Sequence, residues 1–331
     1  MSTAPLRAAM VPVTRQMRAY FAPVNRMSET PTIFDPGACA GFALDAPPEP
    51  WVDLGGVENF ARWYDTPADA VRSGAKGLPA AQFRGALEAR VEFDFVQWGK
   101  LQMALAGGSE HMNVLAPMGN TSPAPAGGTP APAVAMLPGS TASELIVGAG
   151  AVGGFPVGCL VAVDLDYEQQ TGYVGSGIAA AYVTSAAAVK QDPNYVRRVT
   201  FNVGRVAEVT ATSLVLGQAL LGGVPPAGAS AQAVVAFVDR EGGSFFQEWS
   251  ALFVAEEESG GRVCFYYPRL SASSDQKASK GLREDFTTIA KPLSAVSLRA
   301  SFLALPFTDT NDGQTVLCYR SYFPAEMAGT Y

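Results

Sequence analysis

Six residues, Gly148 to Gly153, match the dinucleotide-binding pattern G-x-G-x-x-G and follow a strand-like apolar run. In a dinucleotide site such glycines open a helix whose N-terminal amides hold a pyrophosphate. Here Gly154, Phe155 and Pro156 come next, and both glycine and proline oppose a helix. We therefore expect a flexible glycine turn at this place and no nucleotide site.

Three acidic residues, Asp164, Asp166 and Glu168, alternate along the next apolar segment, so on a strand their carboxylates share one face. Hard cations such as calcium prefer several oxygen ligands at one place. The glycine and the ligand spacing of an EF-hand loop are missing from this segment. The pattern therefore favours a solvated strand face over a metal site.

A second acidic group, Asp239, Glu241 and Glu248, flanks one predicted hairpin beside Trp249. Glycoside hydrolysis uses a pair of carboxylates that need no fixed spacing in the sequence. A carbohydrate-binding or carbohydrate-cleaving β protein is therefore an open alternative. The aromatic residues of this region alternate along strands, however, which is typical of core packing or subunit contact.

The chain has one histidine, His111, so any Ser-His-Asp or Cys-His site must use it. It lies beside a glycine pair at a predicted helix end, and the sequence contains neither a G-x-S-x-G elbow nor a P-loop. We expect a capping or surface histidine. The basic spot at Lys190 and Arg197-Arg198 is typical of a solvated face. The sequence thus assigns no catalytic, cofactor-binding or metal-binding residue, and we do not expect an enzyme.

Charged residues make up 16% of the 331 residues, below the roughly 25% of typical domains. Sparse charge is consistent with burial between subunits. The net charge of −7 disfavours tight sequestration of nucleic acid, because phosphate binding needs clustered Lys and Arg. The N-terminal segment lacks the apolar core of a signal peptide, and no apolar run has the length of a membrane span. We expect a protein without membrane contact that stays in a reducing cytoplasm until it is assembled.

Four cysteines, Cys39, Cys159, Cys264 and Cys318, lie far apart and form no C-x-x-C pair. They are too few for a disulfide scaffold. We expect free thiols buried in a sheet core.

The elements that must position these residues are mainly strands. Residues alternate with period two over 86–95, 245–254 and 296–304, and the turn Asp309–Gly313 leads into another strand over 315–323. On several of these strands both faces are largely apolar. A sheet that hides both faces needs a second sheet, a helix or another subunit, so the pattern favours an assembling β protein.

One short helix is predicted from Val96 to about Leu105, where Trp98 and Leu101 begin an apolar stripe at helical spacing. The pair Gly107-Gly108 is expected to end it. We expect this helix to pack on the sheet of the larger domain.

The chain divides into several segments by composition. Residues 1–80 are irregular and rich in proline, and we expect an extended N-terminal arm and loops. Residues 81–118 and 229–331 are predicted to form one discontinuous β domain, 119–140 a Pro/Ala/Gly linker, and 141–228 a small inserted β domain.

The two β-rich portions, about 1–115 and 229–331, resemble the tail tube (major tail) proteins of long-tailed bacteriophages. The resemblance is carried by Thr14–Pro23, by Trp51–Gly55 followed by Glu58-Asn59-Phe60, by the strand and helix over Leu87–Leu105, and by the closing hairpin from Ser297–Phe302 to Tyr319–Phe323. The segment 141–225 departs from the minimal pattern and is similar to small β modules inserted in phage structural proteins.

The resemblance implies a mainly β fold: a β-sandwich or barrel of the phage tail-tube type with one flanking helix, plus a small inserted β-barrel domain. It also implies hexameric rings that stack into a hollow tube, which holds a tape measure protein and later conducts double-stranded DNA without specific binding. The family brings no catalytic residues with it. We accordingly expect a structural protein of the virion tail, assembled in the host cytoplasm from copies of itself and other tail proteins. Another virion part, such as a decoration or tail-terminator protein, is the alternative.

Overall fold

The computed structural model describes residues 14–25, 28–65, 68–73, 78–84, 87–97, 99–118, 130–165, 200–240, 248–257, 260–273 and 298–323. The fold is mainly β, as predicted. Two compact units divide the chain. The barrel unit comprises Met1–Ala22, Thr32–Gln97 and Trp249–Tyr331, and the inserted unit comprises Pro23–Pro31 and Trp98–Glu248.

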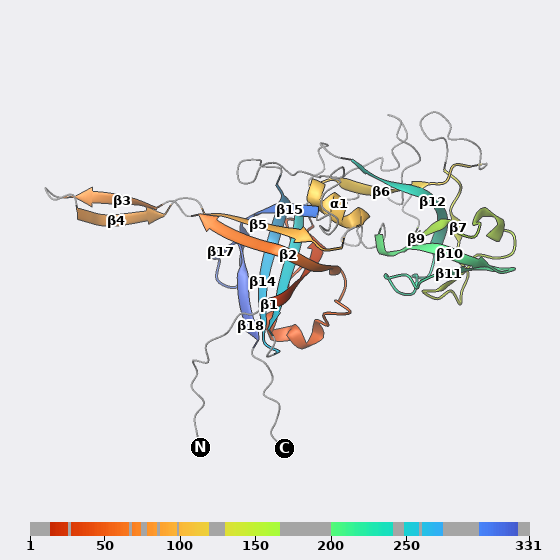
Figure 1. The fold of residues 1–331 in the computed structure, drawn as a ribbon, viewed down its shortest axis with the longest axis horizontal. Helices are drawn as coiled ribbons and strands as arrows, with labels where there is room; N and C mark the ends of the chain where they lie inside the picture. Colours follow the sequence, from red (N-terminus) through yellow and green to blue (C-terminus); the bar gives the residue numbers. More distant parts are fainter. Residues whose placement is uncertain are drawn as a thin grey trace, which may run out of the picture. The chain divides into compact units, whose positions relative to one another are not determined.

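Strands make up almost all of the regular structure of the barrel unit (Figure 1). In chain order its elements are β1 (Thr14–Pro23), the 3-10 helix η1 (Pro36–Gly41), β2 (Val52–Asp65), β3 (Ala68–Ser73), β4 (Leu78–Arg84), β5 (Glu88–Phe95), β13 (Glu248–Glu257), β14 (Arg262–Ala272), β15 (Leu298–Ala304), β16 (Phe307–Thr308), β17 (Thr315–Val316) and β18 (Tyr319–Phe323). Six strands form one antiparallel sheet in the order β13-β1-β2-β5-β15-β14, and β14 returns to β13 and closes it into a barrel. Closure satisfies the strand edges within the ring. The short β18 lies outside the ring and pairs with β14.

The alternation predicted for three strands can be followed in this unit. On β5 and β15 the odd-numbered and even-numbered residues, respectively, are buried, as the sequence indicated. Residues 245–247, the start of the third pattern, lie outside the described residues. From Trp249 to Ala255 every residue is buried, so burial does not alternate there: Trp249 and Phe253 contact Phe21, and Leu252 and Val254 belong to a separate core. The predicted turn Asp309–Gly313 is confirmed: the Gly313 amide donates to the Asp309 carbonyl over 2.8 Å, and Gly313 has a φ of 70°, which favours glycine.

Aromatic rings fill the interior of the barrel. The centroid of the Phe21 ring lies 5.3 Å from that of Phe302, 5.9 Å from that of Phe253 and 6.2 Å from that of Phe93. These three partners belong to β15, β13 and β5, so the contacts cross the barrel. The four rings are almost completely buried, and most of their pairs meet edge to face, the arrangement that aromatic quadrupoles favour.

A second apolar core covers part of the outside of the barrel. Tyr20, Leu252 and Tyr266 alternate with interior residues and therefore point outward, yet each is buried. Their cover comes from the chain itself, because Phe34 and Trp51 of the irregular connection between β1 and β2 pack against them. We call residues 32–51, the part of this connection that belongs to the barrel unit, the covering segment.

Buried hydrogen bonds fix the covering segment to the barrel. The Ser250 hydroxyl on β13 donates to the Pro268 carbonyl of β14 over 2.8 Å and accepts the Thr32 amide over 2.9 Å. The Tyr266 hydroxyl donates to the Thr32 carbonyl over 2.8 Å. The sequence left a second sheet, a helix or another subunit open as the cover of these faces. In the structure barrel closure hides the inner face, and the covering segment hides this part of the outer face.

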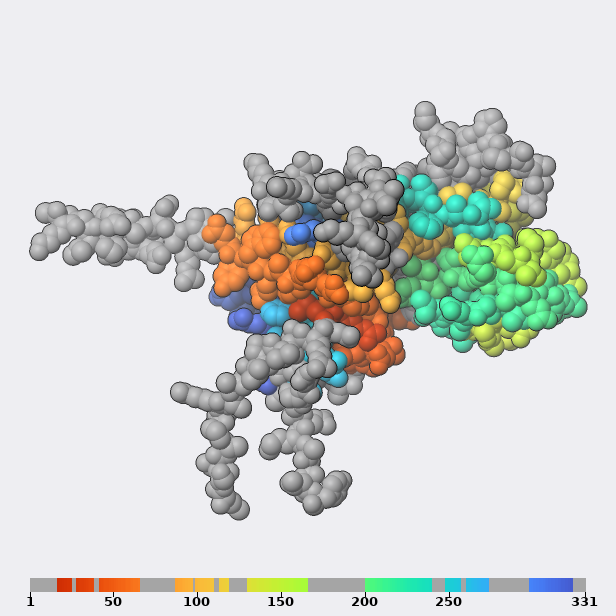
Figure 2. All heavy atoms as spheres, in the orientation of Figure 1, coloured from red at the N-terminus to blue at the C-terminus, as the bar shows by residue number. Residues whose placement is uncertain are grey.

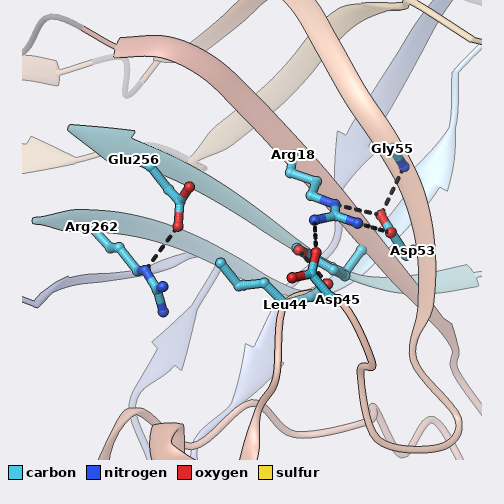
Figure 3. Close-up of polar contacts among 8 residues, drawn as sticks. Arg18, Leu44, Asp45, Asp53, Gly55, Glu256 and Arg262 are labelled. Carbon is cyan, nitrogen blue, oxygen red and sulfur yellow. Dashed lines mark hydrogen bonds and ion pairs between the residues drawn. The ribbon is translucent and has the colours of Figure 1, made fainter. Parts of the chain in front are cut away.

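The Arg18 guanidinium on β1 joins this connection to the start of β2 (Figure 3). It pairs with both carboxylate oxygens of Asp53 at the start of β2 and donates to Asp45 over 2.7 Å. Asp53 also accepts the amide of Gly55 over 2.8 Å. The carboxylates raise the pKa of Arg18 above its ordinary value. Two segments that carry the tail-tube resemblance, Thr14–Pro23 and Trp51–Gly55, are thus paired strands held by one ionic contact.

Short strands and one α-helix form the inserted unit. Its elements are α1 (Lys100–Gly107), β6 (Glu110–Leu115), β7 (Val134–Ala135), β8 (Glu144–Ile146), the 3-10 helix η3 (Val152–Gly154), β9 (Leu160–Leu165), β10 (Val203–Val209), β11 (Ser213–Leu216) and β12 (Ala229–Arg240). The sheet order is β6-β12-β9-β10-β11-β8, and β7 pairs with β12. The amide of Met136 donates to Ala229 and that of Leu137 to Ile146, over 2.9 Å and 2.8 Å. These bonds return the sheet to β12, so it curls into the small barrel that was predicted.

The core of this small barrel is aliphatic and centred on fully buried residues of β8, β9 and β11, namely Leu145, Val161, Val163 and Leu214. The predicted helix exists as α1, and Gly108 ends it in the left-handed conformation. It contacts β6 and β12, which belong with it to the inserted unit. Among the described helices, none has the length and apolar character to cross a bilayer.

Domain boundaries differ from the sequence-based expectation. Residues 1–80 do not form only an arm, because β1 and β2 are integral strands of the closed barrel. The segments 98–118 and 229–248 belong to the inserted unit, because β12 pairs along its length with β6, β7 and β9. The predicted linker 119–140 contributes β7, and its residues 119–129 lie outside the described residues.

Candidate functional site

The glycine-rich motif is a turn, as expected. Gly148 has a φ of 83°, which favours glycine, and the Ala151 amide donates to its carbonyl over 3.1 Å. The three-residue 3-10 helix η3 follows in place of an α-helix. The helix N-terminus that a pyrophosphate needs is therefore missing from this part of the described chain.

The acidic candidates do not converge on a ligand. Asp164 on β9 is 6% exposed, so the expected solvated face is wrong at this position, while Asp166 and Glu168 lie outside the described residues. Within the ranges that the structure describes, no three His, Cys, Asp or Glu side chains are grouped so as to hold a metal ion.

Trp249, the aromatic residue of the carbohydrate alternative, is 5% exposed and lies inside the barrel with its ring centroid 6.1 Å from that of Phe21. It therefore offers no platform for stacking a sugar. Glu241, and the basic spot of Lys190 and Arg197-Arg198, lie outside the described residues.

The cysteines behave as structural thiols. Cys264 is buried in the outer core of the barrel, and Cys159 and Cys318 are half-buried and free. Burial raises the pKa of the Cys159 and Cys318 thiols, which disfavours the reactive thiolate. The side chain of Cys39 lies outside the described residues.

Strand pairing in the inserted unit brings together two residues that the sequence singled out separately. His111 on β6 lies directly opposite Asp239 on β12, and Asn113 lies opposite Phe237 in the same register. Residues paired in this way share a face of the sheet. The helix α1 contacts both strands and brings in Lys100.

The Lys100 ammonium donates to the Asn113 side-chain oxygen over 2.8 Å, and Asn113 is 1% exposed. We call Lys100, Asn113 and Asp239 the Lys100 cluster. Burial lowers the pKa of Lys100 to about 8, and the negative charge of Asp239 acts in the opposite direction.

Sequence reasoning missed Lys100. Nothing in the local pattern separates it from the other lysines, and Asp239, whose charge acts on it, lies far along the chain on β12. The sequence offers one indirect signal for Lys100. It follows Gly99, the N-cap of α1, and a lysine at the first position of a helix is unusual because acidic residues are preferred there.

We predict that the Lys100 cluster gives the inserted unit a characteristic pH dependence. The folded-state pKa of Lys100 is about 8, and an unfolded lysine has a pKa of roughly 10.4. Between these values the unfolded chain binds more protons, so stability rises with pH. From pH 8 to 9.5 the free energy of unfolding should increase by about 1.5 kcal/mol relative to a Lys100→Met variant. Urea unfolding of both proteins at each pH measures the difference, and parallel curves would contradict the prediction.

One face of β2 and β5 in the barrel unit carries several carboxylates, together with Arg90 of β5. Glu58 lies opposite Asp94, and Asp65 lies opposite Glu88, so like charges face each other across the strands. Such pairs are destabilising. Asp94 accepts a 2.7 Å bond from the amide of Asn59, which relieves one pair. Figure 2 shows the orange atoms of β2 at the surface in this view.

The hairpin of β3 and β4 is the other unusual feature of the barrel unit. The two strands pair with each other and form a sheet separate from the barrel. Their register pairs Asp69 with Phe83 and Val71 with Ala81, so these four positions share one face of the ribbon. Three of the four are apolar.

The comparisons with known proteins add no family. No protein-family model matches the chain, and no curated protein matches it.

Proposed function

We propose that this chain is a structural protein, the protomer of a hollow phage-like tail tube that assembles as stacked, hexameric rings. The β3–β4 hairpin is the observation that carries the proposal. A two-stranded hairpin is marginally stable alone in water and needs a surface to pack against. The hairpin is paired with no strand of the barrel, and the apolar positions on one of its faces suit a neighbouring subunit.

The edge strand β18 supports the same proposal. It pairs with β14 on one side, and among the described strands none pairs with its other side. An unpaired edge is a template for a strand of another chain. With the barrel closed, assembly rests on this edge and on the hairpin, and not on unfinished sheet faces.

The facing carboxylates of β2 and β5 suit a tube that conducts double-stranded DNA. A surface with facing carboxylates at Glu58 and Asp94 repels phosphates, so a polyanion slides past without sticking. Like-charge pairs lower the stability of the fold, and a role of this face along the path of the DNA would account for their presence. In this proposal the partners are copies of the chain, a tape measure protein and other tail proteins, and the site of action is the virion tail.

Two of the segments that carry the tail-tube resemblance, Thr14–Pro23 and Trp51–Gly55, lie side by side in the barrel. The carbohydrate alternative has less support, because Trp249 is buried and cannot stack on a sugar.

The hairpin provides the test. We expect Phe83→Ser to abolish assembly of the full-length protein, because it removes an apolar residue from the contacting face, while Gln82→Ser, on the opposite face, leaves assembly intact. Sedimentation velocity over a range of concentrations measures this, with urea unfolding as a check that both variants fold equally well. Identical behaviour of the three proteins, whether all monomeric or all assembled, would contradict the proposal.

A further inference from the structure

The Lys100 cluster holds a primary amine against a carboxamide of the same chain. The Nζ atom of Lys100 lies 2.8 Å from Oδ1 of Asn113, and Asn113 is 1% exposed. The carbon Cγ of Asn113 is bonded directly to that oxygen, so the amine lies beside an electrophilic carbon that is shielded from bulk water. A pair held in this way reacts within one molecule, and this can accelerate a slow reaction by orders of magnitude.

The third member of the cluster, Asp239, places a carboxyl group on the same face of the sheet. The register of β6 and β12 pairs Asn113 with Phe237 and His111 with Asp239. Asp239 is therefore a diagonal neighbour of Asn113, at a separation that longer side chains can bridge. Its charge also acts on the Lys100 amine, so the carboxyl lies within electrostatic range of both reacting groups. A carboxyl group so placed can carry a proton between two nitrogen atoms.

We propose that Lys100 and Asn113 form an isopeptide cross-link within the folded inserted unit, with Asp239 as the proton carrier. The Lys100 nitrogen attacks Cγ of Asn113, a new C–N bond forms, and the original C–N bond of the carboxamide breaks. Asp239 takes a proton from the attacking nitrogen and gives one to the leaving nitrogen. The products are a secondary amide and one ammonia, and no oxidant, reductant or second substrate takes part.

The surroundings of Lys100 suit both the reaction and its product. Burial lowers the pKa of Lys100 to about 8, so more of the amine is neutral near neutral pH than in an exposed lysine. The amide that forms removes a cation from a half-buried place, where a charge is costly. It also ties α1 to β6 by a covalent bond, whether or not the chain assembles into a tube. The pH dependence predicted for Lys100 belongs to the protein before the bond forms, because an amide nitrogen does not titrate.

Mass spectrometry of the full-length protein tests the proposal. The wild-type chain, incubated in the folded state, should be lighter than its sequence by the mass of one ammonia. A protease specific for glutamate, applied to the denatured protein, cuts after Glu92, Glu110 and Glu144. The cut after Glu110 separates Lys100 from Asn113, so only a cross-link can keep the fragments 93–110 and 111–144 together. We expect these two fragments to stay joined in the wild type.

Three variants serve as controls. Lys100→Arg removes the amine and keeps the charge, and Asp239→Asn removes the proton carrier and keeps the amine and the carboxamide. Both should have the full mass and separate fragments, whereas Asp239→Glu, which restores a carboxyl group, should restore the joined fragments. A wild-type chain of full mass with separate fragments would overturn the proposal. So would an ammonia loss that persists in Lys100→Arg, because it would come from cyclisation of an asparagine and not from a cross-link.

Discussion

Replacing Phe21 by alanine should lower the free energy of unfolding of the barrel by about 4 kcal/mol, the largest single effect expected for this chain. The Phe21 ring is fully buried and touches four other rings, those of Phe93, Trp249, Phe253 and Phe302. Alanine removes these contacts and leaves a cavity between strands that cannot collapse without opening the ring.

Urea unfolding followed by tryptophan fluorescence measures this loss, since Trp249 lies against Phe21. The matched control is Tyr64→Ala on β2 of the same barrel, where a large aromatic residue is 70% exposed and its loss should change stability by less than about 0.5 kcal/mol. Should Phe21→Ala fail to fold, Phe21→Leu, with an expected loss of about 1.5 kcal/mol, keeps the comparison measurable. Equal losses for Phe21→Ala and Tyr64→Ala would contradict the closed barrel.

Replacing Ser250 by alanine should cost about 2–3 kcal/mol, although the change removes a single oxygen atom. That oxygen is completely buried and connects the Thr32 amide to the Pro268 carbonyl. The variant deprives the buried Pro268 carbonyl and the half-buried Thr32 amide of this partner. It also loosens the covering segment, so the outer apolar core around Tyr20 and Tyr266 becomes accessible.

Two readouts distinguish this effect from simple destabilisation. Urea unfolding gives the stability, and binding of a hydrophobic fluorescent dye under native conditions should increase several-fold as the covering segment loosens. The control Ser301→Ala, at a half-buried position on β15, should show neither effect. Unchanged dye binding in Ser250→Ala would mean that the other contacts, among them the bond from the Tyr266 hydroxyl to the Thr32 carbonyl, hold the covering segment without Ser250.

Strands were predictable wherever one residue in two is buried. β5 and β15 follow a clean alternation, and glycines with a positive φ at Gly108 and Gly313 mark the ends of elements that the sequence delimited well. β2 is harder to recognise because a register shift between Glu58 and Ala61 interrupts its alternation. A period of two shows that a strand has two faces. It does not distinguish an apolar face that lines the inside of a closed barrel from one that packs against another subunit.

The covering segment could not be predicted as the cover of the outer apolar faces. Phe34, Phe42 and Trp51 are scattered through an irregular, proline-rich connection with no periodicity, so only the folded structure shows that they pack on β1, β13 and β14. The Lys100 cluster escaped prediction for a related reason. Its members come from α1, β6 and β12, and tertiary pairing alone brings them together.

The central claim is that a barrel complete in itself assembles with its copies through the β3–β4 hairpin and the free edge of β18. Electron microscopy of the purified full-length protein, alone and with companion tail proteins, tests it most directly. The claim predicts rings or tubes of uniform diameter from the wild-type chain and separate particles from Phe83→Ser. A wild-type protein that stays a compact monomer at high concentration, even with the companion proteins present, would contradict it.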